Sequence, residues 1–130
     1  MGKSIQIQSV MTLCPHSIGL DQDVQLARKM MRDYGFRHLP VQVGGKLVGI
    51  VSDRDIKFAT AYARHTEGEL GIEDVYIPEP YIVAPTTELR EVLKRLADDK
   101  LGCALVVANE KLVGIFTTVD ACRVLAEQLE

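Results

Sequence analysis

The sequence has no tryptophan, and aromatic residues make up only 5% of its 130 residues. Its three cysteines are odd in number and form no Cys-x-x-Cys pair, which argues against a disulfide framework and favours a reducing, cytoplasmic environment. The net charge is -3, and a chain without excess basic charge is poorly suited to broad binding of a nucleic-acid backbone. Apolar runs fall far short of the roughly 20 residues of a membrane helix. We therefore expect neither nucleic acid nor a membrane as a partner.

Motifs of common catalytic sites are also missing. The chain has no Gly-x-Ser-x-Gly, no His-Glu-x-x-His and no complete phosphate-binding loop, because Met1-Gly2-Lys3-Ser4 lacks the preceding glycine and strand. The three histidines do not have the spacing of metal ligands on one face. Cys103 and Cys122 fall in apolar stretches, which predicts core positions for both. We expect neither an enzyme nor a metal site.

What the sequence does contain is an internal repeat with an offset of 65 residues. The run Lys46-Leu47-Val48-Gly49-Ile50 recurs unchanged at 111–115, and the register holds without a gap from Ile7 with Ile72 to Ala61 with Ala126. Chance would not keep one register over such a length. The chain therefore divides into a first repeat, 1–64, a polar connector, 65–71, and a second repeat, 72–130, which together form one module.

Each repeat has the pattern of a β-α-β-β-α unit. The predicted fold class is α/β in the broad sense, and α+β in detail. In the first repeat, an extended piece at 17–19 precedes a helix at 23–34 whose apolar residues have the spacing of a buried stripe. Two strands, 39–43 and 47–51, flank Gly44-Gly45, a tight-hairpin signal because glycine tolerates positive φ. A helix at about 53–64 closes the repeat.

The second repeat predicts the same elements, with an extended piece at 82–84, helices at 88–100 and 118–129, and a hairpin at Asn109-Glu110. Asp21 in the first repeat and Thr86 or Thr87 in the second are candidate helix caps. One repeat alone would leave much apolar surface exposed. We expect the two repeats to pack together about an approximate twofold axis.

This arrangement resembles the cystathionine-β-synthase-type (CBS) domain family, whose repeats occur in pairs. Ser9-Val10-Met11-Thr12 looks like the opening of a family repeat, and Arg37-His38-Leu39-Pro40-Val41 looks like its second strand. The family signature, Gly-hydrophobic-x-Ser/Thr-x-x-Asp, is matched at 49–55 and again at 114–120. The resemblance implies a regulatory module that binds AMP, ADP, ATP, NAD or S-adenosylmethionine between its repeats. Such modules often form dimers and regulate a partner domain or protein.

The signature residues suit a nucleotide. Ser52 and Thr117 lie where a strand turns into a helix, and free first-turn amides with the helix dipole favour a phosphate there. Asp55 and Asp120 follow three residues later, and a carboxylate can accept bonds from both ribose hydroxyls. By resemblance these are the ribose-binding aspartates. The same residue types are also common helix caps, so capping is the competing interpretation.

The adenine and phosphate contacts have further candidates. The adenine would lie against apolar strand residues, with Ile18 and Pro40 in one repeat and Val83 in the other. By resemblance to nucleotide-binding members, Arg37 and His38 would face the phosphates, and Arg54 and Lys57 would add positive charge nearby. An ordinary solvated edge is the alternative. A magnesium ion could accompany ATP through the oxygens of its triphosphate.

The second repeat departs from this pattern. Gly102, Cys103 and Leu105 replace Arg37, His38 and Pro40, and Thr118-Val119 replaces Asp53-Arg54. We therefore expect two unequal sites. The second could be empty, could prefer a less charged adenosine ligand, or could borrow charge from across the cleft.

Two functions fit the sequence. The first is an adenosine-ligand sensor that changes the conformation of the module or dimer. The second is a ligand-free module for dimerisation or protein interaction with degenerate sites. The stretch 59–63 and the apolar residues of the last helix, Val124, Leu125 and Leu129, offer a surface for a homodimer, although packing within the chain would also explain them.

Overall fold

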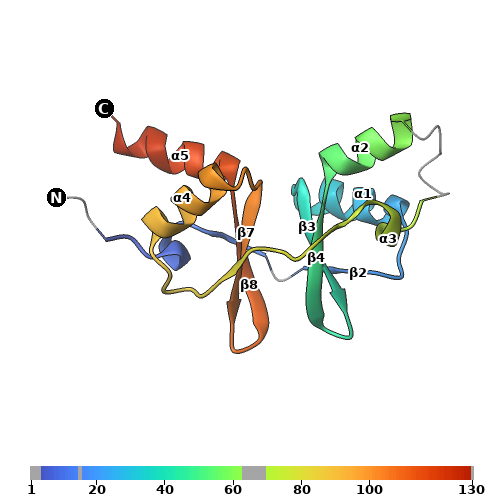
Figure 1. Ribbon diagram of the computed structural model, residues 1–130, viewed down its shortest axis with the longest axis horizontal. Helices are drawn as coiled ribbons and strands as arrows, with labels where there is room; N and C mark the ends of the chain where they lie inside the picture. The colour runs from blue at the N-terminus through green and yellow to red at the C-terminus, as the bar shows by residue number, and fades with distance from the viewer. Residues whose placement is uncertain (1–3, 15, 63–69, 130) are drawn as a thin grey trace. The chain divides into compact units, whose positions relative to one another are not determined.

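The computed structural model describes residues 4–14, 16–62 and 70–129. The chain forms two compact units (Figure 1). One, the first-repeat unit, is His16–Pro80. The other, the second-repeat unit, joins Met1–Pro15 to Tyr81–Glu130. The β-α-β-β-α order predicted for each repeat is confirmed, and the fold is α+β.

The first-repeat unit is a four-stranded sheet packed against helices. The strand order is β2-β3-β4-β5, in which β2 is parallel to β3 and the other pairs are antiparallel. The strands are β2 (Ile18–Gly19), β3 (His38–Val43), β4 (Lys46–Ser52) and β5 (Ile77–Pro78); the helices are α1 (Val24–Tyr34), α2 (Asp53–Tyr62) and α3 (Ile72–Val75).

The core of this unit lies between the sheet and its helices. The apolar stripe of α1 buries Val24, Ala27 and Met31, as its spacing predicts. These side chains cluster with buried strand residues and with residues of α2 and α3, including Leu39, Val41, Val51, Ile56 and Ile72. Burial of such side chains contributes roughly 1.5–3 kcal/mol each. The packed layer fixes the end of β4, from which α2 starts.

Glycine forms the predicted hairpin between β3 and β4. Gly44 and Gly45 have φ values of 58° and 86°, the left-handed region that glycine enters without steric cost. The amide of Gly45 also donates to the side-chain oxygen of Gln42 at 2.8 Å. At the corresponding turn of the second repeat, Asn109 and Glu110 adopt φ values of 51° and 65°. The second hairpin therefore keeps the same turn with residues that tolerate it less well.

The second-repeat unit repeats this plan with other residues. Its strand order is β1-β8-β7-β6, with β6 parallel to β7. Its elements are a 3-10 helix η1 (Ile7–Ser9), strands β1 (Thr12–Leu13), β6 (Ile82–Val83), β7 (Cys103–Ala108) and β8 (Lys111–Thr117), and helices α4 (Leu89–Asp98) and α5 (Thr118–Gln128). Its core includes Ile7, Val92, Leu96, Val106 and Phe116.

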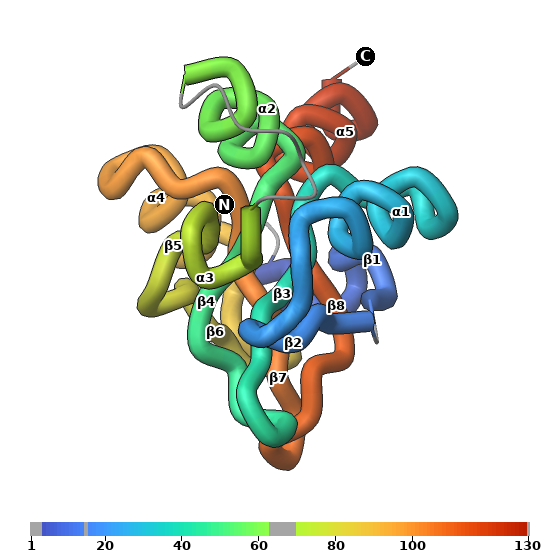
Figure 2. Tube along the Cα trace, turned by 90° about the vertical axis from the view of Figure 1, so that its right-hand side faces the viewer, coloured from blue at the N-terminus to red at the C-terminus, as the bar shows by residue number. Residues whose placement is uncertain are grey.

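The opening segment of each sequence repeat packs on the sheet of the other repeat. We call residues 4–14 and 70–80 the lead-in segments. In the first, β1 pairs with β8; in the second, β5 pairs with β4 (Figure 2). Backbone bonds fix both: the Leu89 amide donates to the Ile5 carbonyl at 2.7 Å, and the Ile72 amide donates to the Gln22 carbonyl at 2.9 Å. The compact units thus follow these contacts, whereas the predicted boundaries follow the sequence repeat.

Several sequence predictions need correction. Asp23, not Asp21, caps α1, because its carboxylate accepts from the Leu26 amide at 2.9 Å. The α4 helix starts after Glu88 without a side-chain cap, and the Thr87 hydroxyl accepts from the Ala84 amide instead. Cys103 is buried as predicted, but Cys122 is exposed. Ala63 and most of the connector, 65–69, lie outside the described residues.

Candidate functional site

Strand β4 ends at Ser52, where the chain turns directly into α2. The Ser52 hydroxyl accepts a hydrogen bond from the Asp55 amide at 3.0 Å and donates to Oδ2 of Asp55 at 2.7 Å. Both side chains are half-buried. The signature of the first repeat therefore brings Ser52 and Asp55 together, as the sequence predicts. Among the residues that the structure describes, Oδ1 of Asp55 has no hydrogen-bond partner.

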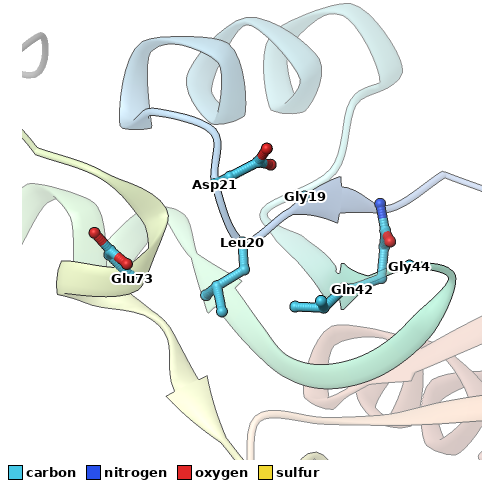
Figure 3. A pocket seen from close by; sticks show the side chains of 7 residues that line it. Gly19, Leu20, Asp21, Gln42, Gly44 and Glu73 are labelled. Carbon is cyan, nitrogen blue, oxygen red and sulfur yellow. The ribbon is translucent and has the colours of Figure 1, made fainter.

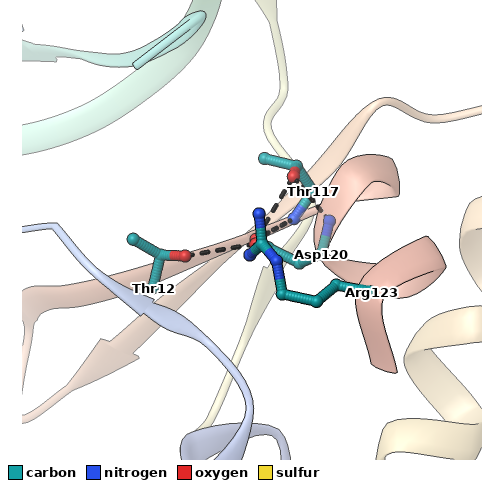
Figure 4. A network of polar contacts seen from close by, with 4 residues as sticks. All are labelled: Thr12, Thr117, Asp120 and Arg123. Carbon is teal, nitrogen blue, oxygen red and sulfur yellow. Dashed lines mark hydrogen bonds and ion pairs between the residues drawn. The ribbon is translucent and has the colours of Figure 1, made fainter. Parts of the chain in front are cut away.

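Strand β8 ends at Thr117 with a similar turn but a denser network (Figure 4). The Thr117 amide donates to Oδ2 of Asp120 at 2.9 Å, and the Thr117 hydroxyl donates to the same oxygen at 3.2 Å. The other oxygen, Oδ1, accepts from the Thr12 hydroxyl at 3.2 Å and from Nη1 of Arg123 at 3.1 Å. Asp120 is only 6% exposed, and its carboxylate has two donors on each oxygen.

Both hydroxyls therefore cap the helices that follow them. Thr117 and Asp120 form a capping box, since each side chain bonds the other residue's amide. The Asp53 amide donates to the Arg37 carbonyl, and the Thr118 amide donates to the Gly102 carbonyl. The helix starts thus offer fewer free amides to a phosphate than the sequence predicts. Capping is established, and a nucleotide contact would use the same groups.

The basic candidates lie around Ser52. His38 is the direct cross-strand partner of Ser52 in the β3–β4 ladder, and Arg37 precedes it on an exposed position. Arg54 is exposed on the first turn of α2. Lys57 instead pairs with Asp53, at 2.9 Å. His38, the first residue of β3, and Arg37, just before that strand, therefore lie next to the end of β4.

Arg28 is a basic residue of this region that the sequence analysis missed. It lies on α1, and its guanidinium is 3.6 Å from the Asp53 carboxylate. Asp53, at the start of α2, thus forms ion pairs with two basic side chains, Arg28 and Lys57. Nothing in the repeat pattern marks position 28, because the contact depends on how α1 packs beside α2.

The apolar candidates are buried strand residues. Ile18 pairs with Val41 in the parallel β2–β3 ladder and is 2% exposed, in the core of the first-repeat unit. Val83 has the equivalent place on β6, paired with Val106. Pro40 is buried opposite Ile50. Ile18 and Val83 lie on edge strands, so backbone groups there could read an adenine more readily than these side chains could.

A pocket of the first-repeat unit lies elsewhere (Figure 3). It has a volume of about 340 Å³ in the first-repeat unit, and its lining includes Asp21, Gln42, Gly44 and Glu73. These residues belong to the hairpin end of β3 and to the segments beside it, whereas Ser52 closes the opposite end of β4. The pocket therefore contains none of the predicted site residues.

The signature glycines have a packing role. A Cβ atom at Gly114 would stand 2.5 Å from Sδ of Met11 and 3.0 Å from the Thr12 carbonyl oxygen. A Cβ atom at Gly49 would meet the Tyr76 ring at 2.5 Å and the Ile77 carbonyl oxygen. In both repeats the glycine lets the lead-in segment cross the strand at close range. This confirms the close-packing role that glycine commonly has inside a strand.

The model of the family named "CBS domain" matches residues 7–62 and 72–127, which is most of the chain. The chain belongs to the CBS-domain family. Its two CBS repeats carry the Ser52/Asp55 and Thr117/Asp120 pairs at equivalent positions.

Known proteins resemble the whole CBS pair. An inosine-5'-monophosphate dehydrogenase of Korarchaeum cryptofilum is 35% identical over 91% of this chain, but the match spans only 23% of that enzyme. A Vibrio cholerae protein described as an acetoin utilization protein, AcuB, is 30% identical, with a TM-score of 0.77 over 98% of this chain and 99% of that one.

Two further structures share the fold at lower identity. The CBS domain pair of protein MJ0100, solved with 5'-methylthioadenosine and S-adenosyl-L-methionine, has a TM-score of 0.85 at 21% identity, covering 98% of this chain and all of that one. CBSX2, solved with AMP, has a TM-score of 0.75 at 22% identity, covering 94% and 97%.

Within residues 4–14, 16–62 and 70–129, no group of three or more His, Cys, Asp or Glu side chains could hold a metal ion. No described helix combines the length and the apolar character needed to cross a bilayer.

Proposed function

We propose that this CBS pair is a regulatory module that binds an adenosine-containing ligand, with Asp55 as the main ribose acceptor. The ligand would be AMP, ADP, ATP, NAD or S-adenosylmethionine. Binding changes the conformation of the module, or of a dimer, only to the extent that the ligand prefers one arrangement over another. The module acts on a partner protein or domain and is not itself an enzyme. We place it in the cytoplasm, without nucleic acid or a membrane as a partner.

The observation that carries this proposal is the state of the Asp55 carboxylate. Its Oδ2 accepts from the Ser52 hydroxyl, while Oδ1 accepts nothing among the described residues. A ribose ring offers two adjacent hydroxyl donors, and a half-buried carboxylate is the acceptor that pairs best with them. Asp120, by contrast, already has four donors and is almost fully buried.

The ligands of related structures support the chemical class. 5'-Methylthioadenosine, S-adenosyl-L-methionine and AMP all contain adenosine and differ at the 5' position. The adenine and ribose are therefore the shared elements, and Asp55 is the residue we assign to the ribose. The 5' group would distinguish the ligands.

The charge around Ser52 favours a ligand with phosphate. His38 lies across the ladder from Ser52, Arg37 precedes it, and Arg54 follows on α2. The second repeat has Gly102, Cys103 and Val119 at these positions. We therefore assign a phosphate-bearing nucleotide to Asp55, with magnesium accompanying it if the nucleotide is ATP.

Isothermal titration calorimetry tests this proposal. The wild-type protein is titrated in turn with AMP, ADP, ATP plus magnesium, NAD and S-adenosylmethionine, and then compared with Asp55→Ala and Asp120→Ala. We expect micromolar binding of at least one ligand, lost in Asp55→Ala and retained in Asp120→Ala. An absence of heat and of thermal shift with all five ligands would reject the sensor proposal.

The second candidate function is a ligand-free module for dimerisation or protein interaction. Apolar side chains on both closing helices favour it: on α2, Phe58 and Tyr62 are 67% and 80% exposed and stack at 5.4 Å, and on α5, Leu125 is 60% exposed. Val124, in contrast, packs against the core of its own unit. We propose that the exposed residues mediate a homodimer.

Sedimentation equilibrium distinguishes a dimer from a monomer. The wild type would sediment as a dimer, and Phe58→Ser with Tyr62→Ser would shift it towards the monomer. Arg32→Ser, at an exposed position on α1, is the control. A wild type that remains monomeric at high concentration would reject the homodimer.

A further inference from the structure

Asp55 and Asp120 occupy equivalent places in the two repeats, but their carboxylates have different neighbours. Asp120 receives bonds from two residues outside its capping box, Thr12 of the first lead-in segment and Arg123 one turn further along α5. Asp55 receives none from the corresponding directions among the described residues. The difference arises from residues outside the signature itself.

The repeat offset shows which residues correspond. Thr12 is followed 65 residues later by Ile77, and Arg123 is preceded 65 residues earlier by Phe58. Thr12 pairs with Ile115 in the β1–β8 ladder, and Ile77 pairs with Ile50 in the β4–β5 ladder, which is the same register. The two donors to Asp120 are thus replaced, at equivalent places, by side chains that have no hydrogen-bond donor.

A ligand must therefore compete with Thr12 and Arg123 for the Asp120 carboxylate. A ribose that approaches Asp120 must displace Thr12 or Arg123 from Oδ1, and each displaced bond to a charged group weakens binding. A ribose that approaches Asp55 finds Oδ1 without a partner among the described residues and with the apolar Ile77 at the equivalent place. The free-energy cost of breaking existing hydrogen bonds therefore applies to a ligand at Asp120 and not to a ligand at Asp55.

We propose that Thr12 and Arg123 form a clamp that keeps the Asp120 carboxylate closed, so that the residue at position 12 or 77 determines which aspartate is open to an adenosine ligand. Thr12 and Arg123 are positioning residues in this proposal. It rests on the proposed function, since it concerns the same class of ligand. It goes further because it attributes the difference between the two sites to two pairs of equivalent residues, Thr12 with Ile77 and Arg123 with Phe58.

The test opens the closed site and closes the open one. In Thr12→Val with Arg123→Met, Asp120 keeps its capping box but loses both outer donors. In Ile77→Thr, a hydroxyl is placed where it can donate to Asp55. Thr86→Val with Arg90→Met removes the same groups at exposed positions of the second-repeat unit and is the matched control. Circular dichroism and thermal unfolding establish that each variant is folded.

Calorimetry with AMP on these proteins gives the readout. We expect one binding event in the wild type, a second event in the opened variant with an affinity about tenfold or more above any residual wild-type binding there, and weaker binding in Ile77→Thr. Adding Asp120→Asn to the opened variant would remove the second event. The control would bind like the wild type.

Two results would overturn the clamp. If the wild type binds AMP but the opened variant binds with the same stoichiometry and affinity, Thr12 and Arg123 do not restrict Asp120, while the sensor proposal stands. If the opened variant loses binding that the wild type has, the two residues contact the ligand rather than exclude it. If neither protein binds AMP or any of the other four ligands, both proposals fail together.

Discussion

Gly49 lies so close to Tyr76 that a Cβ atom at position 49 would stand 2.5 Å from Cδ2 of the tyrosine ring. The same Cβ atom would also meet the backbone carbonyl of Ile77, which is held in the β4–β5 ladder and cannot move alone. We therefore predict that Gly49→Ala lowers the free energy of unfolding by about 1–3 kcal/mol. Urea denaturation measures this change.

Gly114→Ala is the informative comparison. The atom nearest to its new Cβ would be Sδ of Met11, the far end of a flexible side chain, and the nearest backbone atom is 3.0 Å away. Because a methionine side chain can change rotamer, we expect a smaller loss than for Gly49→Ala. Equal losses in the two variants, or a stable Gly49→Ala protein, would contradict the packing role assigned to the lead-in segments.

The cap of α1 gives a second prediction. Asp23 accepts a hydrogen bond from the Leu26 amide, whereas Asp21 does not cap the helix. Asp23→Ala should therefore lower the free energy of unfolding by about 1 kcal/mol, and Asp21→Ala should leave it nearly unchanged. Both variants remove one negative charge, so the comparison isolates the cap. The reverse order of stability would show that the cap lies at Asp21.

Much of the fold could be predicted from local patterns. The stripe of Val24, Ala27 and Met31 predicts the buried face of α1, and Gly44-Gly45 predicts the hairpin. The prediction of Asp21 as the cap is wrong because two aspartates lie close together ahead of α1, and spacing alone does not show which one starts the helix. The exposure of Cys122 was missed because α5 leaves much of its apolar surface uncovered, including Val119 and Leu125.

Part of the site could also be predicted from local patterns. The Ser52/Asp55 and Thr117/Asp120 pairs follow from the repeated signature, since both are local contacts three residues apart. The Thr12–Asp120 bond joins residues 108 positions apart and depends on the lead-in segment crossing to the other repeat's sheet. Two-residue strands such as β1 and β5 have no periodicity that a sequence pattern could reveal.

The buried thiol of Cys103 predicts how the stability of the fold depends on pH. Burial, with a smaller contribution from Cys14, raises the pKa of Cys103 from 9.0 to about 12. A thiol whose pKa is raised on folding stabilises the fold fully below its unfolded pKa, and this contribution is lost as pH rises from about 9 towards 12. One such group gives a slope of about 1.4 kcal/mol per pH unit in this window.

Urea denaturation between pH 8 and pH 11 tests this slope. Cys103→Ala should lose stability less steeply than the wild type across the window, and Cys122→Ala, which removes an exposed thiol, should follow the wild type. Parallel curves for all three proteins would show that Cys103 ionises normally in the folded state. In the native protein, Cys122 should also react with a thiol reagent before the two buried cysteines do.

Asp55 is central to the proposed function, and a nuclear magnetic resonance titration with AMP tests its role most directly. Amide spectra of the 15N-labelled wild type, of Asp55→Asn and of Asp120→Asn are recorded as AMP is added. The account predicts saturable shifts at Ser52, Asp55 and His38 in the wild type, retained in Asp120→Asn and abolished in Asp55→Asn. Shifts confined to the hairpin pocket around Gln42 and Gly44, or shifts that persist unchanged in Asp55→Asn, would contradict it.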